Sequence, residues 1–148
     1  MLDRFEQFSS SISAIYRDIQ KIEKDEMDRR GFKGSFAQYL VTMRRYPEGL
    51  TATEVCELCD RDKAAVSRVM AEMEEKGLVT RSNGNSYRAK LTLTELGYET
   101  ASFVAHRAQV AVHEAGKGLS DEDRKAFYAA LALIASNLQT LSKKGLPE

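Results

Sequence analysis

One predicted helix, residues 62–76, carries side chains suited to hydrogen bonding with the edges of bases. Val66, Val69 and Met70 fall on one side of a helix with 3.6 residues per turn. The other side combines small and basic residues, namely Lys63, Ala64, Ser67, Arg68 and Ala71. Small side chains allow a helix backbone to come close to another surface, and an arginine can bond the O6 and N7 atoms of guanine. This face is therefore a candidate for contacts in the major groove of double-stranded DNA.

An alternative interpretation is an amphipathic helix whose solvated face is rich in alanine, because alanine is the best helix former. The segments before and after this helix distinguish between the DNA-contact interpretation and the solvated-helix interpretation. Before the helix, Thr51–Glu54 fits a capping box that begins a short helix ending near Cys59, and Asp62 suits the N-cap of the helix in question. A solvated helix alone leaves this pair of helices and its tight turn unexplained.

After the helix, the segment Leu78–Leu93 predicts a β-hairpin. Gly77 ends the preceding helix, and apolar residues alternate with polar ones from Tyr87 onward. Asn83-Gly84 supplies a tight turn. The order of helix, short helix, turn, helix and hairpin predicts a winged helix-turn-helix, in which the second helix of the pair lies in the major groove.

Long helical patterns flank this unit. Residues 2–30 place apolar side chains three or four apart, and a capping box at Ser35–Gln38 predicts a helix through about residue 46. Thr94 caps a helix that extends to about residue 115, and Ser120 begins a last helix with a second apolar seam. The two seams are Phe5, Phe8, Ile12, Ile15, Ile19 and Ile22, and Phe127, Leu131, Ile134, Leu138 and Leu141. A small winged-helix core cannot cover both seams, so we expect a homodimer; packing within one chain is the alternative.

The predicted fold class is mainly α (α+β), a winged helix-turn-helix with long N- and C-terminal dimerisation helices. We expect residues 1–148 to form a single domain. Its winged-helix lobe covers about 34–93, and its dimerisation helices cover about 2–30 and 94–144.

Charge is distributed unevenly although the formal net charge of the 148-residue chain is zero. A neutral sum argues against strong non-specific binding to nucleic acid. Between residues 61 and 90, however, basic residues at 61, 63, 68, 76, 81, 88 and 90 outnumber acidic ones at 62, 72, 74 and 75. The hairpin residues Arg81, Arg88 and Lys90 would meet the DNA backbone or the minor groove. A second set lies at helix starts, where free amides favour a phosphate and where simple capping is the alternative: Lys33, Ser35, Gln38, Thr51 and Thr53.

The stretch LTATEVCELCDRDKAAVSRVMAEMEEKGLVTR, followed by RAKLTLTELG, resembles the multiple-antibiotic-resistance regulator (MarR) family. The resemblance covers nearly the whole chain. It implies a dimeric winged-helix transcription factor, often released from DNA by a small ligand or by oxidation, with a recognition helix at 62–76 and a wing at 78–93. The family's Asp-x-Arg pair in the wing falls on Asn85 and Tyr87 here, so Arg88 is our first choice for the minor groove.

We therefore predict a sequence-specific DNA-binding transcription regulator that binds a palindromic operator as a homodimer. Repression and release by a small apolar or aromatic effector are further expectations. Two alternatives remain, a thiol-based redox sensor and a winged-helix module that binds proteins. The residue types Ser67 and Arg68 argue against the second alternative, because they suit DNA.

Two cysteines, Cys56 and Cys59, share a helix face, and a pair with this spacing can serve as a redox device. Such motifs usually lie at a helix N-terminus after a strand, whereas this pair lies inside a short helix, which favours a structural role. Thiol sensing and metal binding remain alternatives, although two cysteines without two further ligands are weak evidence for zinc.

An effector site is expected near the junction of the lobe and the long helices, where four aromatic residues gather. They are Tyr16, Phe32, Phe36 and Tyr39. Aromatic packing in the core is the commoner explanation for such a group.

No pattern of residues suggests catalysis, and we expect no cofactor and no bound metal. The sequence contains no nucleophile elbow, no phosphate-binding glycine loop and no HExxH. Charges interrupt the N-terminal stretch, and no run approaches the roughly 18 apolar residues of a membrane span, so we expect no signal peptide, no membrane association and a cytoplasmic location.

Overall fold

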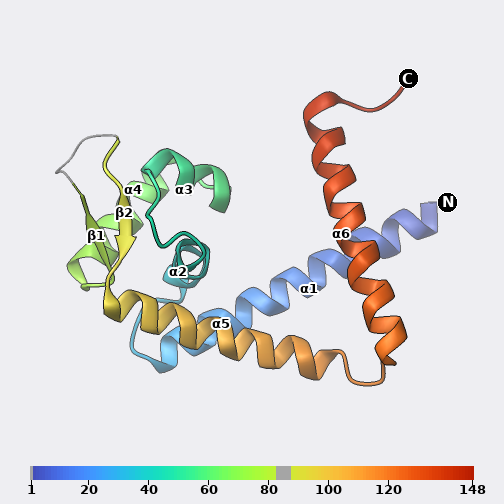
Figure 1. The fold of residues 1–148 in the computed structure, drawn as a ribbon, viewed down its shortest axis with the longest axis horizontal. Helices are drawn as coiled ribbons and strands as arrows, with labels where there is room; N and C mark the ends of the chain where they lie inside the picture. Colours follow the sequence, from blue (N-terminus) through green and yellow to red (C-terminus); the bar gives the residue numbers. More distant parts are fainter. Residues whose placement is uncertain (1, 83–87) are drawn as a thin grey trace. The chain divides into compact units, whose positions relative to one another are not determined.

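A computed structural model describes residues 2–82 and 88–148 and divides the chain into two compact units (Figure 1). The first is Met1–Val112 and the second is His113–Glu148. The Asn83-Gly84 turn, together with Asn85 and Tyr87, lies outside the described residues.

The first unit contains a winged helix-turn-helix lobe between two long helices. In chain order it has α1 (Leu2–Arg29), a 3-10 turn (Gly34–Phe36), α2 (Ala37–Arg44), α3 (Ala52–Cys59), α4 (Lys63–Glu75), β1 (Val79–Arg81), β2 (Leu91–Leu93) and α5 (Glu95–Ala115), of which the last three residues belong to the second unit. The two strands are antiparallel, with Val79 opposite Leu93 and Arg81 opposite Leu91. Leu50 forms an isolated bridge to Leu91, which ties the segment before α3 to the wing. The fold class is the one predicted.

The core of the lobe is built from the apolar faces of α2, α3, α4, the wing and α5. Leu40, Val55, Met70, Leu78 and Val104 are almost fully buried. On α4 the buried residues follow the helical period and leave the opposite face to solvent. The orientation predicted for this helix is therefore confirmed.

Four helix starts predicted from capping residues are confirmed. Thr51 Oγ1 accepts a hydrogen bond from Glu54 N at 3.2 Å, and Asp62 Oδ1 accepts one from Ala65 N at 2.7 Å. Thr94 caps α5 and Ser120 caps α6 in the same manner. Each side chain satisfies one of the free amides of the first helical turn, which fixes where the helix begins.

The capping box predicted at Ser35 is wrong. The chain forms the 3-10 turn first, and α2 begins at Ala37 without a side-chain cap. The turn is closed by the backbone, with Phe36 N donating to Lys33 O at 3.1 Å. Phe36 is 1% exposed, so the tighter turn brings its ring into the core.

The first turn of α5 lies directly against the backbone where the wing begins. Leu78 O accepts a hydrogen bond from Thr94 N at 3.0 Å. A Cβ atom at Gly97 would lie 2.0 Å from the same oxygen, so no residue with a side chain fits there. Thr94 Oγ1 also donates to Gly77 O, which adds a second contact at this corner.

The second unit holds the end of α5, a connection and α6 (Asp121–Lys144). Arg124 donates to Gly116 O at 3.1 Å and so holds the connection against the first turn of α6. No residue of α6 is buried, and Leu138 in its apolar seam is 51% exposed. The seam of α1 is similarly exposed, with Phe5 at 67%.

Within the described residues, no helix combines the length and the apolarity needed to cross a membrane.

Candidate nucleic-acid interface

The exposed face of α4 carries the predicted base-reading residues. Lys63, Ala64, Ser67 and Arg68 are all exposed, as is Ala71 one turn further on. The N-terminal part of the helix, from Lys63 to Ala71, contains no acidic residue. This half of α4 therefore presents small side chains and positive charge together, as contact with base edges requires.

The C-terminal half of α4 is acidic, and two of its carboxylates are paired with basic residues from other elements. Lys33 Nζ lies 2.5 Å from Glu72 Oε2, and Arg81 Nε lies 2.7 Å from Glu74 Oε1. Lys33 and Arg81 were both predicted to contact the DNA backbone. In the structure each of them lies against a carboxylate of α4.

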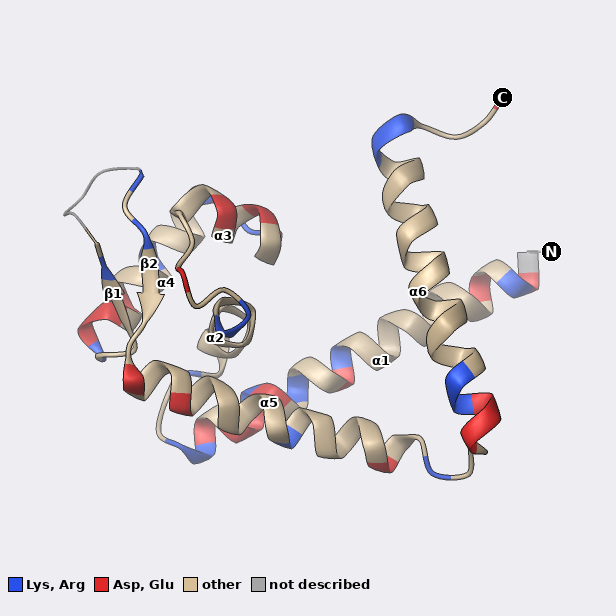
Figure 2. Ribbon diagram, viewed as in Figure 1, with Lys and Arg blue, Asp and Glu red and all other residues tan. Residues whose placement is uncertain are grey.

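The wing carries the remaining predicted basic contacts, and Figure 2 shows basic positions on both of its arms. Lys90 N donates to Ser82 Oγ at 3.0 Å, which helps to close the hairpin, and Lys90 Nζ lies 3.9 Å from Glu54 Oε1. Arg88 is exposed and lies at the start of the described part of the second arm.

The residues predicted at helix starts differ in their surroundings. Thr51 is used as the cap of α3, whereas Thr53 is exposed on its first turn. Ser35 is exposed, and Gln38 is half-buried. These last two line a small cavity of about 110 Å³ between α1 and α2.

Three charged residues of that cavity, Glu23, Lys24 and Arg61, are not among the predicted site residues. Burial raises the pKa of Glu23 above its ordinary value. Arg61 is exposed and precedes Asp62, the cap of α4. Its position next to the N-cap of α4 is the signal in the sequence that could have marked Arg61.

The thiol of Cys59 is poorly suited to redox sensing. Cys56 and Cys59 are free and half-buried, and both pack against the core. Burial raises the pKa of Cys59, although a hydrogen bond with Thr42 acts in the opposite direction. A raised thiol pKa leaves less of the reactive thiolate at neutral pH.

The four aromatic residues predicted to form an effector site do not share one environment. Phe36 and Tyr39 belong to the buried core, and Phe32 packs against it with part of its ring exposed. Tyr16 is 61% exposed on α1. The two buried rings match the packing interpretation that accompanied this prediction.

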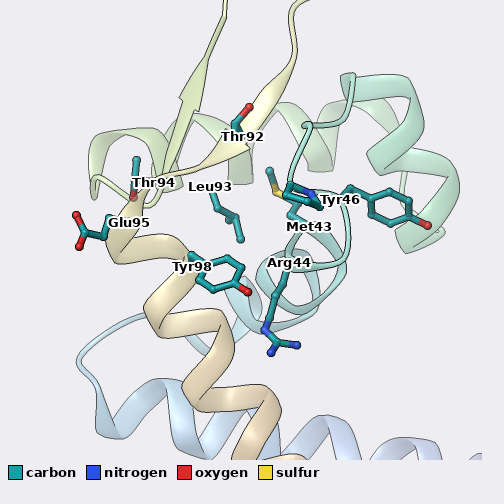
Figure 3. A pocket seen from close by; sticks show the side chains of 9 residues that line it. Met43, Arg44, Tyr46, Thr92, Leu93, Thr94, Glu95 and Tyr98 are labelled. Carbon is teal, nitrogen blue, oxygen red and sulfur yellow. The ribbon is translucent and has the colours of Figure 1, made fainter.

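A larger cavity, of about 300 Å³, lies where α2, β2 and α5 meet (Figure 3). Its apolar lining includes Met43, Leu93 and the ring of Tyr98. Arg44 lies at its edge, where Nε donates to Ser102 Oγ at 3.0 Å and the guanidinium is 5.8 Å from the centre of the Tyr98 ring. The lining of the cavity thus combines an apolar surface with one cation, Arg44, and one carboxylate, Glu95, and this site was not predicted.

Over residues 2–82 and 88–148, no group of three His, Cys, Asp or Glu side chains is arranged to hold a metal ion.

The chain matches the model of one protein family and is similar to many solved structures. A model of the MarR family matches residues 30–89. No curated protein matches the sequence. Among solved structures, the chain is similar to a MarR transcriptional regulator from Methanosarcina mazei, with 19% identity, a TM-score of 0.79 and 92% of each chain covered.

Two further similar structures contain DNA. One is a MarR family transcriptional regulator from Listeria monocytogenes complexed with a 26mer DNA, with 22% identity, a TM-score of 0.73, and coverage of 94% of this chain and 95% of that one. The other is the MepR–DNA complex of Staphylococcus aureus, with 18% identity, a TM-score of 0.72, and coverage of 88% and 97%. At these identities the likeness shows a shared fold.

Proposed function

We propose that this chain, whose residues 30–89 match a model of the MarR family, is a transcription regulator that binds specific sequences in double-stranded DNA. The observation that carries the proposal is the exposed face of α4, where small and basic side chains lie together and no acidic residue falls between Lys63 and Ala71. Two proteins of the same fold were crystallised with DNA. The family consists of transcription regulators, and we propose neither catalysis nor a cofactor for this chain.

The proposed contacts divide into base readers and backbone contacts. Arg68 and Lys63 bond to base edges from α4, Ser67 donates or accepts beside them, and Ala64 allows the close approach. In the wing, Arg88 and Lys90 meet the backbone or the minor groove. At the helix starts, a third set meets phosphates: Ser35, Gln38, Thr51 and Thr53. Backbone contacts of this kind fix the register of the protein on DNA but do not read its sequence.

We further propose a homodimer formed through the long helices, about residues 2–30 and 94–144, which flank a lobe of about 34–93 in a single functional domain. The exposed seams of α1 and α6 support this, because each leaves a row of apolar side chains in solvent. Two recognition helices would then read palindromic half-sites about 34–36 Å apart and repress transcription from the site. Sedimentation should show a dimer at micromolar concentration, and truncation after Gly118 should abolish it. A folded full-length monomer would contradict this proposal.

A small apolar or aromatic effector is proposed to weaken DNA binding. The cavity beside Tyr98 supports this better than the predicted aromatic group, because it is open and touches both the wing and α5. Filling it by Thr92→Trp should reduce the response to any effector found by screening, and Tyr16→Ala should not. The opposite result would favour a site on α1.

The proposed function is tested by selecting bound sequences from random double-stranded DNA. We expect a palindrome, with an affinity that falls steeply as salt concentration rises. The matched control is the double variant Lys63→Glu and Arg68→Glu. It should fold as the wild type does but enrich no DNA sequence in the selection. Recovery of no preferred sequence by the wild-type protein would contradict sequence-specific binding.

A further inference from the structure

The acidic half of α4 is held from two sides by basic residues. Lys33 comes from the segment before α2, and Arg81 is the last residue of β1. Their partners, Glu72 and Glu74, lie in the last turns of the helix. Two separate elements thus contribute one cation each to a helix end that would otherwise carry unbalanced negative charge.

The pair between Arg81 and Glu74 is the better shielded of the two. The side chains of Arg81 and Glu74 are 28% and 43% exposed, whereas those of Lys33 and Glu72 are 64% and 40% exposed. Partial burial lowers the screening by water, so a short pair of this kind is stronger than a fully exposed one. The Arg81 pair should therefore persist in solution.

This pair joins the two elements that must meet DNA together. The strand β1 has only three residues, and its last one is tied to the recognition helix seven positions earlier in the chain. If Arg81 left Glu74 to bind a phosphate, a carboxylate at the end of α4 would lose its counter-charge near the polyanion. A role in holding the wing to the helix avoids that cost.

We propose that Arg81 is a positioning residue for DNA binding, which holds β1 against the end of α4 through Glu74 and makes no direct contact with phosphate. Lys33 holds the other side of the helix through Glu72 in the same way. The proposal rests on the proposed function, since it concerns how the lobe engages DNA. It replaces the expectation from sequence that Arg81 and Lys33 are backbone contacts.

A double-mutant cycle tests the Arg81 pair, using DNA selected by the wild-type protein. The variants are Arg81→Glu, Glu74→Arg and the two together, in which the charges are exchanged and the net charge is unchanged. We expect each single variant to bind DNA at least about fivefold more weakly than the wild type, as for the loss of a partly shielded pair. The exchanged variant should recover most of the lost affinity. The dependence of log affinity on log salt should keep its wild-type slope in the exchanged variant, because the protein neutralises the same number of phosphates.

Three results would overturn the proposal. The exchanged variant could remain as weak as Arg81→Glu with a lower salt slope, which would make Arg81 a direct ligand of a phosphate. Glu74→Arg alone could bind more tightly than the wild type, which would show that Glu74 only repels DNA. Either single variant could bind as the wild type does, in which case the pair has no role.

Two controls distinguish positioning from direct binding and from loss of folding. Arg88→Ala removes a proposed direct contact with the DNA backbone, so it should lower the salt slope by about one for each phosphate that is no longer neutralised, and no change at Glu74 should rescue it. Melting curves for every variant identify loss of folding, and the exchanged variant decides the question if a single variant does not fold. Failure of the wild-type protein to bind any DNA would instead count against the proposed function.

Discussion

Arg107 on α5 and Glu26 on α1, 81 positions apart in the chain, form a hydrogen-bonded ion pair, with 3.3 Å between Nε and Oε1. The Glu26 side chain is only 9% exposed, and its other cation, Arg29, is further away at 3.7 Å. The pair therefore links the first long helix of the chain to α5 through a nearly buried carboxylate.

Replacing Arg107 with alanine should destabilise the fold. The change leaves a buried carboxylate with one weaker partner, and we expect the free energy of unfolding to fall by about 1–2 kcal/mol. Denaturant unfolding at one fixed protein concentration measures it. Lys21→Ala is the control, because Lys21 and Asp25 form an exposed pair whose loss should cost less than about 0.5 kcal/mol. If both variants lose the same free energy of unfolding, the pair between Arg107 and Glu26 stabilises the fold no more than an exposed ion pair does.

Arg68→Ala should weaken specific binding by about 1–3 kcal/mol per half-site and relax selection at one base pair. The fold should be unaffected, since Arg68 is exposed. Repeating the selection from random DNA with the variant measures both effects. A uniform loss of affinity at every sequence would assign Arg68 to the backbone.

Ala64→Leu should abolish specific binding by a steric route. Ala64 is exposed in the free protein, so the melting temperature should hardly change. In the major groove, the larger side chain would collide with base edges and push α4 outward. Ala64→Ser keeps the side chain small and should bind as the wild type does. If the leucine variant also binds normally, α4 does not enter the groove.

Arg88→Ala should weaken binding to all sequences about equally and lower the salt slope by about one for each phosphate that Arg88 neutralises. Titration at several salt concentrations, on the selected site and on an unrelated duplex, measures this. Lys125→Ala serves as the control, because it also removes one positive charge, but from α6, outside the proposed DNA interface. An added change in preference, mainly between A·T and G·C, would show that Arg88 enters the minor groove, as the family resemblance implies, and a change at one base pair only would contradict a backbone role.

Glu23→Gln should stabilise the protein at neutral pH. Burial raises the pKa of Glu23 above 4.5, so the folded protein holds this proton more tightly than the unfolded chain. The wild-type protein then loses stability as the pH rises from 4.5 through the folded pKa, whereas the glutamine variant does not. Melting curves should show the variant more stable at about pH 7 and equal to the wild type below about pH 4. A difference independent of pH would exclude burial of the carboxylate as the cause.

Local features of the sequence were sufficient to predict most helix boundaries and the exposed face of α4. Thr51, Asp62 and Thr94 each bond an amide three residues later, so the sequence alone contains both partners. Ser35 has the same local pattern, and its prediction failed because burial of Phe36 favours a tighter turn there. Non-local packing outweighed the local signal.

The surroundings of the basic residues were not predictable in the same way. Glu72 lies 39 positions from Lys33, and no sequence pattern joins them. Lys33 and Arg81 therefore both looked available for DNA. The cavity beside Tyr98 depends similarly on the meeting of α2 with β2 and α5, which come much later in the chain.

The contact between Gly97 and Leu78 determines how movement passes through the lobe. Side chains between two elements can absorb a small shift by changing rotamer, but here a helix backbone touches a carbonyl oxygen with nothing in between. The hydrogen bond from Thr94 N to the same oxygen prevents the two from separating freely. Any tilt of the wing must consequently turn the first residues of α5 with it, so the wing and the start of that helix behave as one mechanical part.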